Sequence, residues 1–242
     1  MSRPRVAAFF DFDNTLLAED GARIGIKYLW QRKEISFFFI LRVLYANRYF
    51  KRDKISAEQM AAIVLSFYKG KELARFQAEA RDYYADKLKP HLSPYLIDEL
   101  EDHRRRGHVL VLLSGSVRYM LEPVVEDLGF DHLLCTDLEV GGDGRLTGRA
   151  SGPVCVGETK ATLAKALAET QNIDLPASYA YADHISDVPI MELVGNPVAV
   201  EPSLSLEAHA KSRGWPIVGH HHPDAGDTPE TELVEAAPRD VP

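Results

Sequence analysis

Short apolar runs alternate with longer amphipathic stretches along most of the chain. The runs cover residues 5–10, 108–113, 178–182 and 197–200, and a polar or acidic residue follows each of the first three. A compact apolar run that ends in charge or glycine is typical of a buried strand. Between the runs, apolar residues recur at helical spacing over residues 94–106, 117–128, 160–171 and 186–194. Strands that alternate with helices predict an α/β fold, with a doubly wound parallel sheet covered by helices on both faces.

Two segments interrupt this alternation, and a third follows it. Residues 19–89 come directly after the first strand and are rich in helical pattern, so we expect an inserted helical cap. Residues 138–148 place Gly-Gly-Asp-Gly between apolar alternations, which predicts a β-hairpin. Residues 219–242 are rich in proline and acid, so we expect a disordered tail. The predicted core therefore comprises residues 1–18 and 90–218.

The expected cap contains one unusually apolar segment, ISFFFILRVLYANRYFKR. Its uninterrupted apolar part, residues 37–41, is far shorter than the roughly 20 residues that span a bilayer. We therefore interpret the segment as a cap helix that packs on its neighbours. The alternative is a helix at a membrane interface or a pocket for lipid, because several basic residues suit anionic headgroups: Arg42, Arg48, Lys51, Arg52 and Lys54.

Composition and charge narrow the classes of protein. The chain has 242 residues and a net charge of −8, of which residues 219–242 supply −5 through six acids and one base. The rest is only mildly acidic, so we expect no nucleic-acid partner. Two cysteines, Cys135 and Cys155, do not make a disulfide framework. The first residues lack a signal-peptide pattern, and we expect a cytoplasmic protein.

Reactive side chains follow three of the predicted strands. Asp11 and Asp13 follow the first strand, and Ser114 follows the second. Asp183 follows the third, with Asp187 four residues further on. Because the carboxyl ends of parallel strands meet at one edge of a sheet, we expect these groups to converge there.

The expected cluster has the chemistry of a phosphate site with a metal. Several close carboxylates cannot all stay ionised without a cation, and a set of oxygen ligands favours Mg²⁺. Lys160 offers a positive charge to a phosphate, Ser114 offers a hydroxyl, and Gly115 and Ser116 offer backbone N–H groups at an expected helix start. One carboxylate could attack phosphorus while a second transfers protons. Each signature alone is common in caps, turns and surfaces, but their order at successive strand ends favours a site.

Four segments resemble the motifs of the haloacid dehalogenase-like hydrolases. FDFDNTLL resembles the first motif, Asp-x-Asp-x-Thr, and LLSGS resembles the second. GETK resembles the lysine motif, and YADHISDVPIME resembles the fourth, acidic motif. Their order and spacing match over residues 6–218, and the helical insert resembles the type 1 cap. LEVGGDGRLTG resembles a segment of the phosphoserine phosphatase-like branch, subfamily IB. The resemblance implies a Rossmann-like core.

The resemblance also implies roles for the acidic residues. Asp11 would be the nucleophile and a Mg²⁺ ligand. Asp13 would be the general acid and base, and its backbone carbonyl would bind the metal. Asp183 would be a further metal ligand. Asp187 would support the metal shell or Lys160.

The remaining motif residues are implied to hold the phosphate. Thr15 would orient the phosphate loop. Ser114, Gly115 and Lys160 would bind the phosphoryl group that is transferred.

Some positions depart from the family pattern. His184 follows the fourth-motif aspartate where Ser or Gly is usual, and Asn14 and Ser116 replace Ser and Gly of phosphoserine phosphatases. Those enzymes carry a glutamate shortly after the first motif that reads the substrate amine, and here Glu19 or Asp20 stands nearby. The implied chemistry is unaffected, but the substrate is left open.

We therefore expect a Mg²⁺-dependent phosphomonoesterase that forms an aspartyl-phosphate and acts on a small, phosphoserine-like phosphorylated metabolite. The alternatives within the enzyme class are histidinol phosphate and phospholipids such as lysophosphatidate or phosphatidylglycerophosphate. A different class is a phosphate-binding interaction module without activity. The presence of both Asp11 and Asp13 favours the enzyme.

Overall fold

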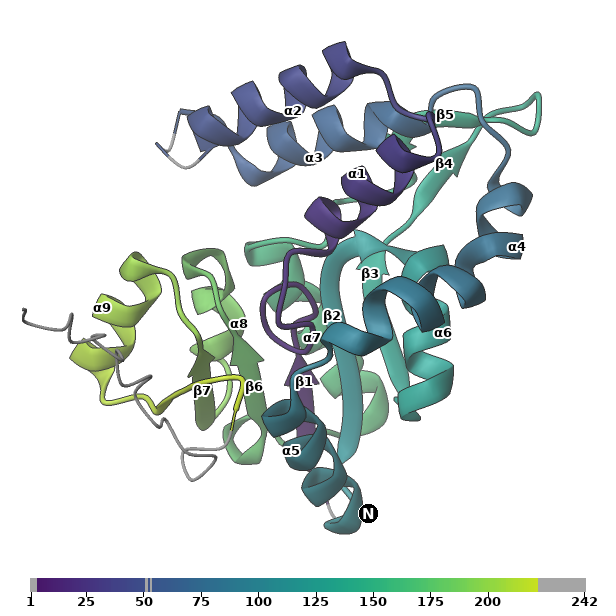
Figure 1. Cartoon of the computed structure of the whole chain (residues 1–242). Coiled ribbons are helices and arrows are strands. Elements are labelled where there is room, and N and C mark those ends of the chain that lie inside the picture. Colours follow the sequence, from purple (N-terminus) through teal and green to yellow (C-terminus); the bar gives the residue numbers. More distant parts are fainter. Residues whose placement is uncertain (1–3, 51, 53, 222–242) are drawn as a thin grey trace, which may run out of the picture.

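A six-stranded parallel sheet forms the centre of the molecule (Figure 1). The structure, a computed structural model, describes residues 4–50, 52 and 54–221. The strand order is β3-β2-β1-β6-β7-β8, so β1 lies between β2 and β6 and is paired in parallel with both. This arrangement confirms the predicted doubly wound parallel sheet. The strands are β1 (Ala7–Phe10), β2 (Val109–Val117), β3 (His132–Thr136), β6 (Tyr179–Ala182), β7 (Asn196–Val200) and β8 (Ile217–Val218).

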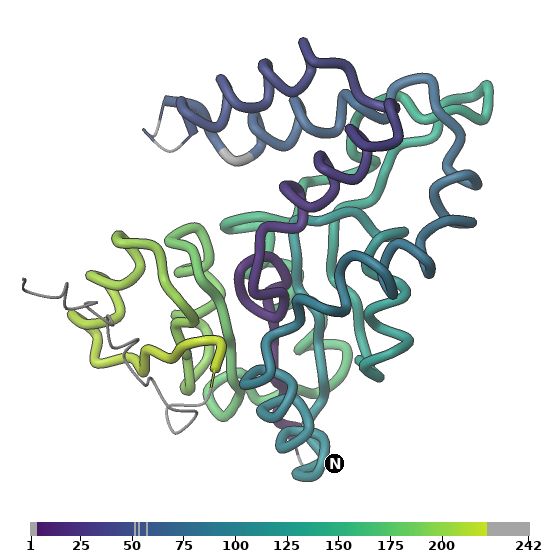
Figure 2. Tube along the Cα trace, in the orientation of Figure 1, coloured from purple at the N-terminus to yellow at the C-terminus, as the bar shows by residue number. Residues whose placement is uncertain are grey.

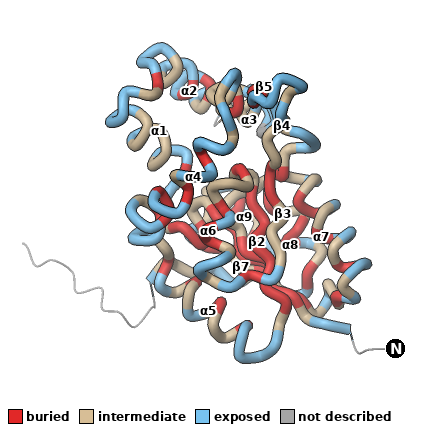
Figure 3. The backbone as a smooth tube through the Cα atoms, turned by 90° about the vertical axis from the view of Figure 1, so that its right-hand side faces the viewer, coloured by how far each residue is buried: buried red, intermediate tan, exposed pale blue. Residues whose placement is uncertain are grey.

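Helices cover both faces of the sheet because each strand residue points to the face opposite its neighbour's. Ala8 and Phe10 of β1 pack in one apolar cluster with α5 and α6, whereas Ala7 and Phe9 pack in a second cluster with α7, α8 and α9. Figure 3 shows the buried residues gathered along the sheet. The helices are α5 (Pro94–Arg105), α6 (Arg118–Leu128), α7 (Glu158–Gln171), α8 (Val188–Met191) and α9 (Leu204–Arg213).

Four further helices form the segment that was predicted as a cap, and they lie beyond the carboxyl ends of the strands (Figures 1 and 2). The last of them returns to the core, where it packs against α6. Tyr84, just after it, donates a hydrogen bond of 2.6 Å to Asp127 of α6. The domain boundary at residue 89 stays a prediction, because this end of the segment shares the core's apolar cluster. The helices are α1 (Gly21–Gln31), α2 (Phe37–Phe50), α3 (Ala57–Leu65) and α4 (Leu73–Tyr83).

The predicted hairpin is present as the antiparallel pair β4 (Leu138–Val140) and β5 (Leu146–Ala150). It also contacts the loop before α4. The Leu146 N–H donates to the Lys71 carbonyl, and the Leu146 carbonyl accepts from the Gly70 N–H, each at 2.8 Å. The hairpin therefore binds the cap to the end of the sheet.

Helix α2 is apolar on both faces. Val43 and Ala46 are buried, whereas Phe38 is 81% exposed and Leu44 is 58% exposed. Such a helix has no purely polar side to turn toward water. Within the described part of the chain, no helix has the length and apolarity needed to cross a bilayer.

Among the described strands and α-helices of the core, β3, β8 and α9 were not predicted, because their apolar runs are short or lie among polar residues. The strand β2 extends through Ser-Gly-Ser to Val117, so Gly115 and Ser116 end a strand and do not start a helix as expected. Of the predicted tail, residues 222–242 lie outside the described residues. The His220 carbonyl accepts hydrogen bonds from the Tyr95 N–H and the Ser93 hydroxyl.

Candidate active site

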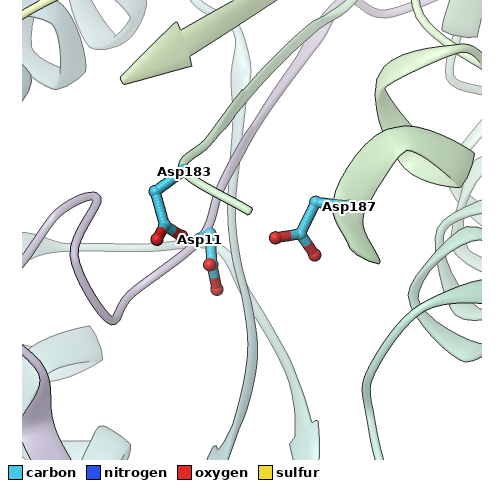
Figure 4. Close-up of side chains that lie close together, drawn as sticks. All are labelled: Asp11, Asp183 and Asp187. Atoms are coloured by element: carbon cyan, nitrogen blue, oxygen red, sulfur yellow. The ribbon is translucent and has the colours of Figure 1, made fainter. Parts of the chain in front are cut away.

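Three carboxylates converge at the carboxyl edge of the sheet, as the sequence predicts (Figure 4). Asp11 follows β1, Asp183 follows β6, and Asp187 ends the short 3-10 helix after it. One oxygen from each of the three lies within 4.8 Å of the others. The two strands are adjacent in the sheet, which is why residues 172 positions apart in the chain meet here.

Lys160 joins this cluster from the first turn of α7. Its ammonium lies 2.8 Å from an oxygen of Asp11 and 2.8 Å from an oxygen of Asp187, and the side chain is 4% exposed. Burial opposes the charge of the ammonium, but the two carboxylates outweigh burial and raise the pKa of Lys160 above its ordinary value. Lys160 therefore carries a fixed positive charge between two acids.

The single lysine does not compensate all the negative charge of the cluster. Burial raises the pKa of Asp11 to about 7, against the opposing effect of Lys160 and with a further rise from Asp187. Burial, together with Asp11 and Asp187, raises the pKa of Asp183 to about 8. Carboxylates in this state are stabilised by a bound cation. Oxygen donors in such a group suit Mg²⁺ among the common metals.

Asp13 lies in a different environment, two residues beyond Asp11. One of its oxygens accepts from the Gly21 N–H at the start of α1, and the other accepts from the Ser116 hydroxyl, each at 2.8 Å. Burial raises the pKa of Asp13, although the Ser116 hydroxyl opposes this shift. The side chain belongs to neither the carboxylate cluster nor its ion pairs with Lys160. The role of Ser116 as a partner of Asp13 could not be inferred from its place in the Ser-Gly-Ser motif.

The predicted phosphate-binding residues line the same edge. Thr15 is fully buried, and its hydroxyl has no hydrogen-bond partner among the described residues. Ser114 is also fully buried and accepts from the Ser116 N–H at 3.1 Å. A Cβ on Gly115 would lie 2.9 Å from a methyl group of Val156, so only glycine fits without a shift of that side chain. Ser114 and Gly115 therefore lie at the end of the strand next to β1, which Asp11 follows, and Thr15 lies four residues after Asp11.

A cavity of about 350 Å³ extends from Asp13 and Ser116 into the cap. Sequence reasoning missed its lining, because the residues come from the four cap helices and the segments between them, from α6, from the ends of two strands and from the loop before α7. The first turns of α1 contribute Gly21 and Gly25, and α4 contributes Tyr83. The sequence predicted a helix-rich segment here but could not show which of its residues face the site.

The residues that were expected to read a substrate amine lie outside this cavity's lining. Asp20 caps α1, where its side chain accepts from the N–H groups of Ala22 and Arg23. Glu19 lies 3.1 Å from His91. His184, whose role the sequence left open, stacks on Phe50 at the end of α2. That contact joins the fourth-motif loop to the cap.

Comparison with known proteins agrees with this geometry. The family model of the haloacid dehalogenase-like hydrolases matches residues 8–192, and the chain belongs to that family. The resemblance inferred from the four motifs is thus confirmed.

Relatives and solved structures extend this result. An "Inhibition of morphological differentiation protein" of Streptomyces azureus is 34% identical over 92% of this chain and 81% of its own. A histidinol-phosphatase of Neisseria meningitidis is 31% identical over 87% of this chain and 97% of its own. A Bordetella pertussis protein of unknown function superposes with a TM-score of 0.80 at 27% identity, over 90% of this chain and 100% of its own. A phosphoserine phosphatase with an analogue of the phospho-aspartyl intermediate superposes with a TM-score of 0.65 at 19% identity, over 91% of this chain and 95% of its own. It shares the fold.

Proposed function

We propose that this protein is a Mg²⁺-dependent phosphomonoesterase in which Asp11 is the nucleophile. The observation that carries the proposal is the difference in surroundings between two nearby aspartates. Asp11 lies among carboxylates and Lys160, in a place that suits a metal and a phosphoryl group. Asp13 lies apart, hydrogen-bonded to Gly21 and Ser116 and exposed to the cavity.

The first step transfers the phosphoryl group to the protein. A carboxylate oxygen of Asp11 attacks phosphorus, and the bond from phosphorus to the ester oxygen breaks. Asp13 gives its proton to the departing oxygen. Burial favours the protonated form of Asp13 that this step needs, because burial raises its pKa.

The second step releases phosphate. Asp13, now ionised, takes a proton from water, whose oxygen attacks phosphorus while the bond to Asp11 breaks. Inorganic phosphate leaves, and both aspartates return to their starting states. Lys160 and the hydroxyls of Thr15 and Ser114 hold the phosphoryl oxygens during both steps.

Asp11 and Asp183 would hold the magnesium ion through their side chains. The close approach of these carboxylates and the raised pKa of each fit a dication. Asp13 would add its backbone carbonyl. The bound ion supplies neutralising charge for the phosphoryl oxygens.

The Asp11→Asn variant tests the proposal. Hydrolysis of p-nitrophenyl phosphate in Mg²⁺ should fall by about 10³-fold or more, because the amide is a poor nucleophile. The exposed Asp82→Asn on α4 is the matched control and should keep wild-type turnover. Acid-quenched wild-type protein should carry the phosphoryl group on Asp11 by mass spectrometry. Substantial turnover by a folded Asp11→Asn protein would refute the assignment of the nucleophile.

The sequence predicts a phosphoserine-like substrate, and a second candidate is histidinol phosphate. The Neisseria relative, named a histidinol-phosphatase, is covered over 97% of its length. Measuring kcat/KM for histidinol phosphate against phosphoserine under identical conditions decides between the two polar substrates.

A further inference from the structure

The cavity above Asp13 is mainly hydrocarbon. Its lining includes Ile26, Leu29, Val64, Phe67 and Phe76. At about 350 Å³ it lies at the small end of the range for pockets that enclose small organic ligands. Apolar walls of this kind favour apolar parts of a ligand, because burying them removes their surface from water.

The charges that border the cavity are already neutralised. Among the described residues that line it, the charged ones besides Asp13 are Glu34 and Glu79. Glu34 lies 2.7 Å from Arg32 and 2.6 Å from Arg75. Glu79 lies 3.2 Å from Arg32 and 3.7 Å from Arg75. Both acids are thus paired with arginines, and the ammonium of Lys71, 3.0 Å from the centre of the cavity-lining Phe67 ring, adds a further positive charge that disfavours an ammonium group here.

One buried polar group in the cavity lacks a partner. Tyr83 is 9% exposed and lines the cavity, and its hydroxyl has no hydrogen-bond partner among the described residues. A buried hydroxyl without a partner is unfavourable, so a ligand atom that bonds to it gains affinity. Tyr68 and Tyr119, which also line the cavity, are instead hydrogen-bonded to each other at 2.9 Å.

The helix α1 sets the spacing between Tyr83 and the reaction centre. A Cβ on Gly21 would lie 2.5 Å from an oxygen of Asp13, and a Cβ on Gly25 would lie 3.4 Å from the Tyr83 hydroxyl. These glycines are four residues apart and so lie on one face of the helix, about 6 Å apart along its axis. The Tyr83 hydroxyl and the Asp13 carboxylate therefore approach α1 at points about one helical turn apart. The absence of side chains at both glycines keeps the space between them open.

We propose that the leaving group is an uncharged, mainly hydrocarbon alcohol that carries one hydrogen-bonding atom, bound by Tyr83, about 6 Å from the ester oxygen. This inference rests on the proposed phosphatase function and specifies the substrate class. It disfavours phosphoserine and histidinol phosphate, because the ammonium group of either would enter an apolar cavity without a free carboxylate. Short soluble alcohols and long-chain amphiphiles share the required chemistry.

Matched substrates test the polarity of the cavity. Hexyl phosphate and 6-aminohexyl phosphate share a six-carbon chain and differ by one terminal ammonium group. We expect kcat/KM to favour hexyl phosphate by about 30-fold or more, because burying an unpaired ammonium is costly. Calorimetric binding of hexylphosphonate and 6-aminohexylphosphonate should show the same order without turnover. Equal values for the two chains in both assays would overturn the inference.

A substrate pair and a variant test Tyr83. In 4-methoxybutyl phosphate an ether oxygen replaces one chain carbon of hexyl phosphate at the depth of the Tyr83 hydroxyl. Changing Tyr83→Phe should lower the ratio of kcat/KM for the ether over hexyl phosphate by roughly 3- to 10-fold, the effect of one hydrogen bond. Tyr84→Phe is the control, because Tyr84 bonds to Asp127 and does not line the cavity; it should leave the ratio unchanged. An unchanged ratio in Tyr83→Phe would contradict the assignment.

Gly25→Leu tests the same space without removing a polar group. Leucine is more favourable than glycine within a helix, so the change should not weaken α1. Its side chain would fill the cavity beyond Asp13 and lower the ratio of kcat/KM for hexyl over methyl phosphate by about 10-fold or more. If that ratio does not fall, the chain binds elsewhere and the inference is wrong.

The length of the alkyl chain distinguishes a soluble alcohol from a long-chain amphiphile as the leaving group. A rise in kcat/KM from hexyl to hexadecyl phosphate would support an amphiphile, and a maximum near hexyl would support a soluble alcohol. Preference for methyl phosphate over both would overturn the inference. If the wild type hydrolyses none of these esters or p-nitrophenyl phosphate in Mg²⁺, the proposed function fails, whereas the phosphonate binding test still decides the polarity of the cavity.

Discussion

The edge of the sheet and the cavity above it differ in almost every physical property. At the edge, one oxygen from each of Asp11, Asp183 and Asp187 lies within 4.8 Å of the others, and the buried ammonium of Lys160 pairs with Asp11 and Asp187. In the cavity, hydrocarbon predominates, and the two acids of its lining besides Asp13 are paired with arginines. The difference suggests that the edge provides the reaction while the cap selects the alcohol. Asp13 borders both regions, since it contacts Gly21 of the cap and Ser116 of the sheet.

Removing divalent metal should have the largest effect, and only at the edge. Treatment with EDTA should lower kcat/KM by about 10³-fold or more, because the carboxylates would lose their compensating cation. Added Mg²⁺ should restore turnover and raise the unfolding temperature of the wild type. In Asp183→Asn the rise in unfolding temperature should shrink. Full activity in EDTA would contradict a metal-dependent edge, since the acidic residues would then act without a metal.

The Asp13→Asn variant should have the next largest effect, and its size should depend on the alcohol. For an alkyl phosphate we expect a loss of roughly 10²- to 10⁴-fold, because the departing alkoxide needs a proton. The loss in the rate of phosphoryl transfer to Asp11 should be smaller for p-nitrophenyl phosphate, because its leaving group is stable as an anion. Burst kinetics separate this step from phosphate release. An equal loss of phosphoryl transfer with both esters would argue against Asp13 as the general acid.

A buried histidine of α5, which packs on one face of the sheet, should affect stability without affecting substrate choice. The ring of His103 is 1% exposed and contacts the Tyr181 hydroxyl at 2.8 Å and His108 at 2.7 Å. Burial, with help from His108 and Arg106, lowers the pKa of His103 to about 4. The unfolded chain therefore binds more protons between about pH 6.5 and pH 4, and this residue's contribution to stability is lost as the pH falls through that window.

Urea unfolding at pH 7 and pH 4.5 measures the effect of this histidine. The loss of unfolding free energy on acidification should be smaller in His103→Gln than in the wild type, by up to about 3 kcal/mol. The exposed His91→Asn is the control and should match the wild-type loss. The ratio of kcat/KM for hexyl over 6-aminohexyl phosphate should be the same in all three proteins. An altered ratio in His103→Gln would show that this face of the sheet is coupled to the cavity.

The smallest effects should separate the two faces of α2. Val43 is 6% exposed and lines the cavity, whereas its neighbour Leu44 is 58% exposed. Val43→Ala should lower the unfolding free energy by about 1 kcal/mol and weaken the preference for hexyl phosphate. Leu44→Ala should change stability by less than about 0.5 kcal/mol and leave that preference intact. An equal effect of the two changes on substrate preference would show that the cavity does not select the alcohol.

The reactive edge could be predicted from the sequence because the chemistry follows the strands. Asp11, Ser114 and Asp183 each come directly after an apolar run, and parallel strands bring such positions together. The strands β1, β2, β6 and β7 were predicted to within a few residues for the same reason. The edge strands β3 and β8 were missed, since short or partly exposed strands lack a continuous apolar signal.

The cavity could not be predicted, because its properties depend on how separate helices pack. The spacing of Gly21 and Gly25 is visible in the chain, but their contacts with Asp13 and Tyr83 are not. Arg75 and Glu79 have the i,i+4 spacing of a helical ion pair, but only the fold brings Glu34 and Arg32 to them.

The sequence by itself therefore determined the family, the parallel sheet and the residues of the reactive edge, because these follow from the order of short segments. The tertiary structure decided the environment of each group. It placed Lys160 between Asp11 and Asp187, gave Asp13 a separate set of partners, and left the Tyr83 hydroxyl without a partner in the described part of the chain. Burial and pairing depend on distances across the fold, and these distances set both the charge of the site and the polarity of the cavity.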